Sequence, residues 1–232
     1  MSHLKNALTE RPHVVATVTQ PGDLALLTPS ENVAADILEF RLDDLSDSLP
    51  GVWRTIESTQ TPSLVTVRSP DEGGAGNLDA ARRLELYRTI LPTADLVDTE
   101  IASLETDDFA GFIDEIHAAE ALAVASFHDF NGFPGIEEIQ IKMDAAYEMG
   151  ADIAKVAVVV ETMSQLFDLV KLVESHRQQE RLISAMGMGP LGKISRLILA
   201  KAGSCLNYGY LRTENAPGQW SAERLARLLA EL

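Results

Sequence analysis

One lysine, Lys155, stands inside the apolar run "ADIAKVAVVV" at residues 151–160. Lysine is rarely buried, because moving an unpaired ammonium out of water costs on the order of several kcal/mol. Such desolvation lowers the pKa of the amine, and the neutral form can then attack a ketone carbon to form an imine. The alternative is structural, with Lys155 paired to a carboxylate such as Glu39 or Glu100. Position alone does not separate the two interpretations.

A histidine in "SFHDF", His128, could supply the proton transfers that imine chemistry needs. Forming an imine and then breaking a neighbouring bond both require a proton carrier that titrates near neutral pH. A lone histidine is more often a hydrogen-bonded structural residue. The combination of His128 with Lys155 nevertheless favours the catalytic interpretation of both.

Further charged and polar residues end or follow apolar runs elsewhere in the chain. Glu39 and Arg41 lie two apart in "EFRLD", which places both on one face of a strand. An ion pair between these two is the structural alternative. The other residues of this kind are Arg68, Glu100, Arg196 and Gln219.

The elements that must position these residues alternate regularly along the chain. Apolar, β-rich runs are separated by amphipathic stretches, and there is no long linker. The runs are residues 13–19, 35–42, 63–69, 94–101, 122–130, 151–159, 182–188 and 205–211. This pattern predicts an α/β fold, a (β/α)8 TIM barrel that forms a single domain over residues 1–232. A Rossmann sheet is disfavoured because no run is followed by the glycine fingerprint of a dinucleotide site.

In a TIM barrel the active site is built at the carboxyl ends of the strands. His128 would end the fifth strand, and Lys155 would lie on the sixth. The fold therefore predicts that the polar residues named above converge on one rim of an otherwise apolar scaffold.

The glycine-rich segment "GMGPLGKIS" nearly matches a phosphate-binding loop. In such a loop a serine or threonine follows the lysine and binds magnesium, but here Ile194 follows it and Ser195 comes one residue late. The segment is therefore not expected to bind a nucleotide. A glycine-rich turn that opens a helix could still receive a substrate carboxylate, helped by Arg196.

Charge and composition exclude several classes of partner. The chain has 35 acidic and 19 basic residues, a net charge of −16, which repels phosphate backbones and anionic lipid. No apolar run approaches the roughly 18 residues of a membrane-spanning helix, and the N-terminus lacks the apolar core of a signal peptide. We therefore expect a cytoplasmic protein with no nucleic-acid or membrane partner. The single cysteine, Cys205, is expected to be a buried apolar residue.

The excess of acidic residues also suggests a hypothesis about habitat. Only six of the 19 basic residues are lysine, so carboxylates and arginine dominate the charged surface. Dense carboxylates keep a surface hydrated in a high-salt cytoplasm, where salt screens their mutual repulsion. The alternative is an ordinary acidic protein.

Seven short motifs, in order, resemble those of the type I 3-dehydroquinate dehydratases of the shikimate pathway. They are "EFRLD" (39–43), "TVRSPDEGG" (66–74), "VDTE" (97–100), "SFHDF" (126–130), "AKVAV" (154–158), "MGMGPLGKISR" (186–196) and "APGQ" (216–219). The resemblance covers essentially the whole chain. It implies a barrel, commonly a homodimer, that converts 3-dehydroquinate to 3-dehydroshikimate with no metal and no organic cofactor.

The resemblance also implies roles for individual residues. Lys155 would form the imine with the substrate ketone, His128 would be the general base and acid, and Glu72 would orient the histidine. The residues that would hold the ring hydroxyls are Glu39, Arg41 and Arg68, and those that would hold the carboxylate are Arg196 and Gln219. This sequence departs from the family at Asn215, which stands where a small hydroxyl residue is expected before "APGQ" and could also contact substrate. The loop 212–220 is expected to close over the ligand.

Two other functions remain open on the sequence. A class I aldolase would share the barrel, the lysine on the sixth strand and the imine, but it would cleave a carbon–carbon bond. A non-catalytic barrel would form no covalent adduct with any keto acid. An assay of 3-dehydroquinate turnover against aldol cleavage separates these possibilities.

Overall fold

Parallel strands and intervening helices make up a computed structural model of the chain, which describes residues 2–27, 33–214, 216 and 218–232. The strands are β1 His13–Val18, β2 Ile37–Arg41, β3 Ser63–Thr66, β4 Leu96–Glu100, β5 Leu122–Asp129, β6 Ile153–Val159, β7 Leu182–Met188 and β8 Leu206–Tyr210. The α-helices are α1 Ser2–Glu10, α2 Pro21–Leu24, α3 Leu42–Leu45, α4 Leu49–Ser58, α5 Ala80–Ile90, α6 Ile101–Leu104, α7 Phe112–Ala118, α8 Ile136–Glu148, α9 Met163–Gln178, α10 Gly192–Ala202 and α11 Ala222–Ala230. Among these helices, none is long and apolar enough to cross a membrane.

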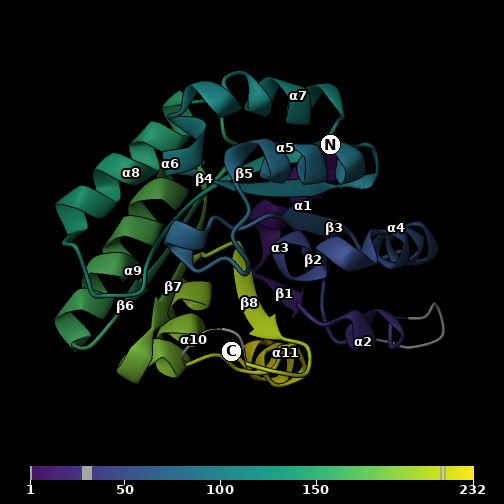
Figure 1. Ribbon diagram of the computed structural model, residues 1–232. Coiled ribbons are helices and arrows are strands. Elements are labelled where there is room, and N and C mark those ends of the chain that lie inside the picture. The colour runs from purple at the N-terminus through teal and green to yellow at the C-terminus, as the bar shows by residue number, and fades with distance from the viewer. Residues whose placement is uncertain (1, 28–32, 215, 217) are drawn as a thin grey trace.

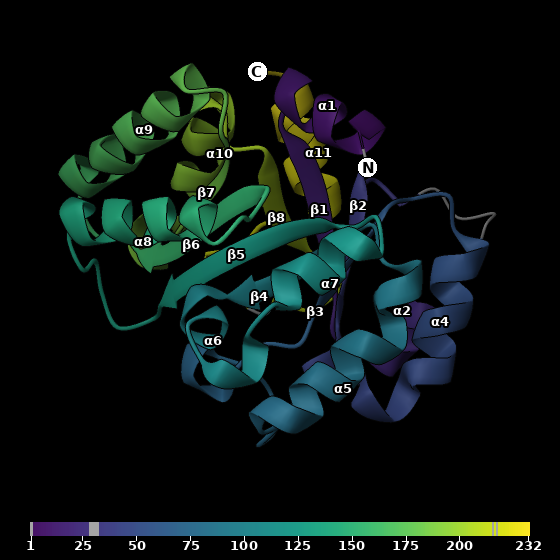
Figure 2. The same cartoon turned by 90° about the horizontal axis from the view of Figure 1, so that it is seen from above.

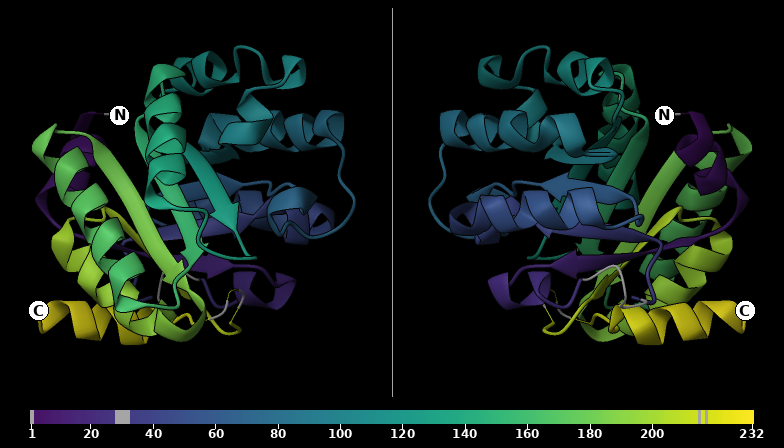
Figure 3. Two further views of the ribbon diagram at one scale, coloured as in Figure 1. Left: turned by 90° about the vertical axis from the view of Figure 1, so that its left-hand side faces the viewer. Right: turned by 90° about the vertical axis from the view of Figure 1, so that its right-hand side faces the viewer.

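The strands form one parallel sheet that curls into a nearly closed barrel. Their order is β7-β6-β5-β4-β3-β2-β1-β8, so strands that are consecutive from β1 to β7 pair with each other, and β8 pairs with β1. Helices surround the strands on the outside (Figures 1 and 2). Figure 3 shows the same outer helical layer from two opposite sides. The predicted (β/α)8 barrel is therefore confirmed.

The seam between β7 and β8 is closed differently from the rest of the barrel. In the described part of the chain these two strands form no ladder, although the Cys205 amide donates to the Ile183 carbonyl at 2.9 Å. Two serine hydroxyls supply the other bonds. Ser184 Oγ donates to the Leu206 carbonyl at 2.8 Å, and Ser204 Oγ accepts from the Ala185 amide at 3.0 Å. Cys205 itself is buried, as predicted.

Two apolar layers hold the barrel together, as alternation of side chains across a strand requires. One layer lies between the sheet and the helices. The other lies inside the barrel, and toward the amino-terminal ends of the strands it includes Val15, Ile37, Leu64, Leu96, Leu122, Ile153 and Leu206. Leu8 of α1 belongs to this inner layer, so α1 covers the end of the barrel at which the strands begin (Figure 2). Polar side chains are thereby left to the other end.

Most strands are shorter at their ends than predicted, and the difference at one end is largest for β3, which ends three residues early. This strand was expected to reach residue 69, but it ends at Thr66. Beyond that point helix α5 supplies the backbone partners. The Val67 amide donates to the Tyr87 hydroxyl at 3.0 Å, and the Val67 carbonyl accepts from Arg83 Nε at 3.0 Å. Arg68 therefore follows the strand rather than ending it.

Candidate active site

Eight of the nine predicted site residues line one cavity of about 100 Å³ at the carboxyl ends of the strands. They are Glu39, Arg41, Arg68, Glu72, His128, Lys155, Arg196 and Gln219. The ninth, Asn215, lies outside the described residues. Residues separated by as many as 180 positions thus face one space, which is the convergence that the barrel prediction requires. The described residues contain no group of three His, Cys, Asp or Glu side chains that could hold a metal ion.

Lys155 lies deep in this cavity, with only 4% of its side chain exposed. Its Nζ donates to Asp98 Oδ2 at 2.6 Å. The carboxylates suggested by the sequence, Glu39 and Glu100, are therefore not its ion-pair partners. Burial lowers the pKa of Lys155, and the positive charge of Arg68 lowers it further, while Asp98 opposes both. The neutral amine is thus more accessible than in an ordinary lysine.

Asp98 organises the charges at the centre of the barrel. Besides Lys155, it accepts a hydrogen bond from Ser126 Oγ at 2.6 Å and pairs with Arg68 Nη2 at 2.9 Å. Burial alone would raise the pKa of Asp98, but Arg68 and Lys155 outweigh burial and hold that pKa well below its usual range. Asp98 is not among the site residues predicted from the sequence. Its position two residues before Glu100, on the same face of β4, was the available signal.

Replacing this carboxylate should destabilise the fold. We expect Asp98→Asn to lower the free energy of unfolding by about 3 to 5 kcal/mol, because Lys155 would keep a buried charge without its ion-pair partner and Arg68 would keep only Glu100. Urea denaturation measures the change. Asp107→Asn, at an exposed position, is the control and should have little effect. An unchanged unfolding free energy for Asp98→Asn would mean that water, not Asp98, stabilises the two cations.

His128 is held by Glu72 through two contacts to the same oxygen. Glu72 Oε2 accepts from the His128 backbone amide at 2.9 Å and lies 2.8 Å from His128 Nδ1. Burial lowers the pKa of His128 well below its ordinary value, and the charges of Arg68 and Lys155 lower it further. Burial raises the pKa of Glu72 to about 7, although Arg68 acts in the opposite direction. We infer a neutral imidazole that donates from Nδ1 to Glu72, which leaves Nε2 free to accept a proton.

The turn that carries Glu72 depends on its two glycines. Gly73 has φ of 82°, and a Cβ there would lie 2.8 Å from the ring of Phe130. At Gly74 a Cβ would lie 2.1 Å from the Arg68 carbonyl oxygen. The Phe130 ring in turn stacks on His128 at 6.4 Å between centroids. The motif "DEGG" therefore brings Glu72 under the imidazole by close packing that a larger residue would prevent.

Three other predicted residues have partners of their own. Glu39 accepts from Thr66 Oγ1 at 2.8 Å, while Arg41 pairs with Asp43 at 2.7 Å. The alternative of a Glu39–Arg41 ion pair is therefore wrong. Arg68 donates to Glu100 at 2.8 Å and also contacts Asp98. Its guanidinium is thus largely engaged in fixing the buried carboxylates.

The glycine-rich segment contributes Met188 to the lining of the cavity, and Arg196, which follows the segment, lines the cavity as well. Ser195 Oγ accepts from the Gly187 amide at 3.1 Å and donates to the Gly192 carbonyl at 2.8 Å, so this hydroxyl fixes the turn. Arg196 of α10 donates to the Tyr208 carbonyl at 2.9 Å. Burial lowers the pKa of Arg196 to about 10, which leaves the guanidinium charged at neutral pH. A buried cation that faces a cavity is suited to a carboxylate ligand.

The loop that follows β8 is held by its own polar contacts. Glu214 accepts from the backbone amides of Gly218 and Gln219, at 2.9 and 3.1 Å. Trp220 Nε1 donates to the Lys193 carbonyl at 3.0 Å. Gln219 lines the cavity from this loop. Closure of the loop over a ligand stays a prediction.

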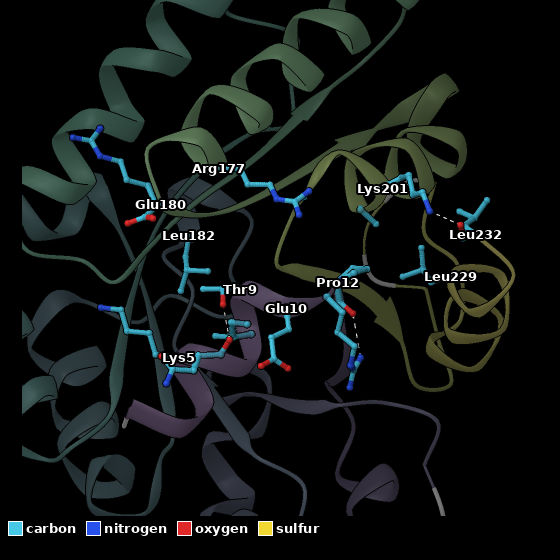
Figure 4. Close-up of a pocket in the computed structure, with 16 residues that line it drawn as sticks. Lys5, Thr9, Glu10, Pro12, Arg177, Glu180, Leu182, Lys201, Leu229 and Leu232 are labelled. Atoms are coloured by element: carbon cyan, nitrogen blue, oxygen red, sulfur yellow. Dashed lines mark hydrogen bonds between the residues drawn. The ribbon is translucent and has the colours of Figure 1, made fainter.

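A larger cavity, of about 770 Å³, lies at the opposite end of the barrel, beside α1 (Figure 4). It is lined by several cations, but most of them are already paired: Lys5 with Asp152, Arg11 with Asp36 and Arg181 with Asp144. Among the residues that the structure describes, its lining contains no histidine or cysteine. The volume of a cavity therefore does not identify the reactive site, and the smaller cavity that contains Lys155 and His128 is the candidate active site.

Comparisons with known proteins agree with this geometry. A family model described as Type I 3-dehydroquinase matches residues 14–232. The 3-dehydroquinate dehydratase of Methanocella arvoryzae is 34% identical over 217 residues, which cover 92% of this chain and 94% of that protein. The crystal structure of 3-dehydroquinate dehydratase from Geobacillus kaustophilus has a TM-score of 0.84 at 28% identity, over 96% of this chain and 91% of that one.

A second solved structure is the type I 3-dehydroquinate dehydratase of Clostridium difficile with covalently modified comenic acid. Its TM-score is 0.82 at 26% identity, over 95% of this chain and 92% of that one. Fold, motifs and relatives agree along the length of the barrel. The chain therefore belongs to the type I 3-dehydroquinase family, and it is an enzyme of the hydro-lyase class.

Proposed function

We propose that this protein, a cytoplasmic homodimer, converts 3-dehydroquinate to 3-dehydroshikimate and water through a covalent imine on Lys155. The observation that carries the proposal is the placement of Lys155 and His128 in one cavity, with a lowered pKa for the buried amine. An amine that can lose its proton next to a neutral imidazole is the arrangement that imine-dependent elimination needs.

The covalent steps follow from the two side chains. The neutral Lys155 amine adds to the ketone carbon of the substrate. The former carbonyl oxygen takes up one proton from the amine and one from solvent, and it leaves as water to give a protonated imine. His128 Nε2 then removes a proton from the adjacent carbon, and the electron pair moves to the imine nitrogen. The pair returns as the carbon–oxygen bond at the next carbon breaks, and the hydroxyl leaves with the proton held by His128. Water then hydrolyses the product imine and frees Lys155.

The remaining cavity residues suit the rest of this substrate, which is a polyhydroxylated carboxylate. The Arg196 guanidinium and the Gln219 amide would bind the carboxylate, and Glu39 and Arg41 would bind ring hydroxyls. Arg68 also lines the cavity, yet its guanidinium is paired with Asp98 and Glu100, so its main role would be to hold those carboxylates. We therefore propose that Arg68 acts on the substrate less directly than the family resemblance implies.

Formation of the conjugated enone product tests the activity directly. Purified protein is mixed with 3-dehydroquinate, and the rise in ultraviolet absorbance is followed. We expect turnover that depends on the protein, and no aldol cleavage of keto-sugar phosphates. Aldol cleavage without dehydration would favour the aldolase alternative, and the absence of both activities would favour a non-catalytic barrel.

Loss of the carboxylate contact should appear mainly in substrate affinity. We expect Arg196→Ala to raise KM by about 10-fold to 100-fold, because a charge-assisted hydrogen bond is lost in the ground state and the transition state alike. Steady-state kinetics with 3-dehydroquinate measure the change. Arg224→Ala, exposed on α11, is the control for the loss of one positive charge. A fall in kcat with unchanged KM would instead place Arg196 in a transition-state role.

The acidic composition supports a second proposal, that the protein is adapted to high salt. With a net charge of −16, surface repulsion should be strong in dilute buffer and screened as the Debye length falls to about 3 Å near 1 M salt. We expect the melting temperature to rise steadily with potassium chloride up to molar concentration. Glu148→Gln combined with Glu174→Gln, two exposed positions, should melt higher in low salt and gain less from added salt. A melting temperature that does not rise would show an ordinary acidic protein.

A further inference from the structure

An aromatic ring lies beside the reactive amine, and neither the family motifs nor the proposed mechanism assigns it a task. Tyr208 of β8 is buried, with 3% of the residue exposed, and it lines the same cavity as Lys155. Lys155 Nζ lies 4.2 Å from the centroid of the Tyr208 ring. A cation this close to a ring is attracted by the electrons of the aromatic system, and desolvation strengthens the attraction.

The chemistry of the imine makes this contact more valuable than it is for the free amine. A lysine ammonium carries three N–H donors, whereas its protonated imine carries one. In the free protein, Asp98 Oδ2 accepts from Lys155 Nζ at 2.6 Å, and the same oxygen can accept the single donor that the imine keeps. The rest of the positive charge spreads over the planar C=N group, where no N–H is left to donate. This part of the charge can be stabilised only by a neighbour that attracts a cation without accepting a hydrogen bond. A flat aromatic face meets this need.

We propose that the Tyr208 ring is a positioning platform that stabilises the protonated imine on Lys155 and so increases the fraction of enzyme held as this intermediate. The inference rests on the proposed function, because it needs the imine to form. The ring would act on the intermediate more strongly than on the bound ketone, which is uncharged at the reacting carbon. Stabilisation that is greater for the intermediate than for the bound ketone raises the fraction of enzyme held as the intermediate, rather than substrate affinity alone.

The phenol oxygen has no part in this proposal. The Tyr208 hydroxyl is buried and has no hydrogen-bond partner in the described part of the chain. The ring is instead fixed through its own backbone, because the Tyr208 carbonyl accepts from Arg196 Nη1 at 2.9 Å. Substituting phenylalanine therefore keeps the platform and removes only an unpaired hydroxyl, which makes Tyr208→Phe the matched control.

The test compares two rings of similar shape that differ in the electron density of their faces, and it adds a variant that has no ring. Three proteins are compared: Tyr208→Phe, a protein with pentafluorophenylalanine in place of Tyr208, and Tyr208→Leu. Each is mixed with 3-dehydroquinate and a limiting amount of borohydride, and the initial rate of label attachment at Lys155 is measured by mass spectrometry. That rate is proportional to the fraction of protonated imine.

We expect Tyr208→Phe to be labelled at the rate of the parent protein, and the other two to be labelled about tenfold more slowly. Without substrate, the pKa of Lys155, read from the pH dependence of its reaction with an amine reagent, should fall in the same two proteins and not in Tyr208→Phe. The fluorinated ring keeps the packing, so it answers the question even if Tyr208→Leu does not fold.

The outcomes separate this inference from the proposed function. A parent protein that is never labelled at Lys155 contradicts the imine mechanism itself. A labelled parent with equal labelling of the phenylalanine and pentafluorophenylalanine proteins leaves the imine intact and overturns the platform. Slow labelling of Tyr208→Phe also overturns it, because the hydroxyl would then be the active group.

Discussion

Lys155→Ala is expected to abolish both the dehydration of 3-dehydroquinate and its covalent capture by borohydride. The amine is the group that would form the imine, and among the described residues that line the cavity Lys155 is the only one with a primary amine. Lys155→Arg should be equally inactive, although it keeps the positive charge, because a guanidinium remains protonated and cannot attack a ketone. Turnover is measured by ultraviolet absorbance, and capture is measured by the mass of the labelled peptide.

The other five lysines act as internal controls for this experiment. Lys5, Lys142, Lys171, Lys193 and Lys201 lie elsewhere on the chain, and the side chains of Lys5 and Lys171 are 48% and 77% exposed. None of these five is among the lining residues of the cavity that would hold the substrate ketone, so they should stay unlabelled. A label on any of the five, or an active Lys155→Arg, would show that Lys155 serves structure or electrostatics.

His128→Ala should slow elimination by about 100-fold to 10,000-fold while the imine still forms. The proton on the carbon next to the imine would then lose the base that is proposed to remove it, so the substrate adduct should accumulate. The measurement combines turnover with the amount of borohydride-trapped adduct at a fixed time. His117→Ala is the control, since His117 bonds to Asp152 away from the cavity. Near-normal turnover of His128→Ala would exclude His128 as the general base.

The fold could be predicted from the sequence because its signals are local. Each apolar run is followed by a helical pattern, and the number and order of such units select a barrel with little ambiguity. The site residues could also be predicted as a group, since barrel geometry brings strand ends together whatever the details of each strand. Lys155 and His128 stood out because their residue types contrast with apolar neighbours.

The partners of these residues could not be predicted, and Lys155 shows the reason. Glu39, Asp98 and Glu100 all lie on strands and face the interior, so each was a possible partner by residue type. Which one reaches the amine depends on the height of each residue in the barrel, and this height follows from strand tilt and register. The position of Arg68, which was predicted to end β3 but follows it, could not be predicted for a similar reason. Its strand ends early because side chains of α5 take over the backbone bonds of Val67, which the sequence of β3 does not reveal.

The seam between β7 and β8 is the place where we expect the barrel to open locally. To open, a regular ladder must break several backbone hydrogen bonds. This seam depends on one hydrogen bond between backbone groups and on the hydrogen bonds of two serine hydroxyls. Local opening free energy is lowest where such bonds are fewest, so amide hydrogen exchange should begin along this line. On one side, β7 pairs with the strand that carries Lys155, and on the other, β8 carries the Tyr208 ring. Transient widening of the seam would separate the amine from its platform, which couples the lifetime of the closed barrel to the lifetime of the imine.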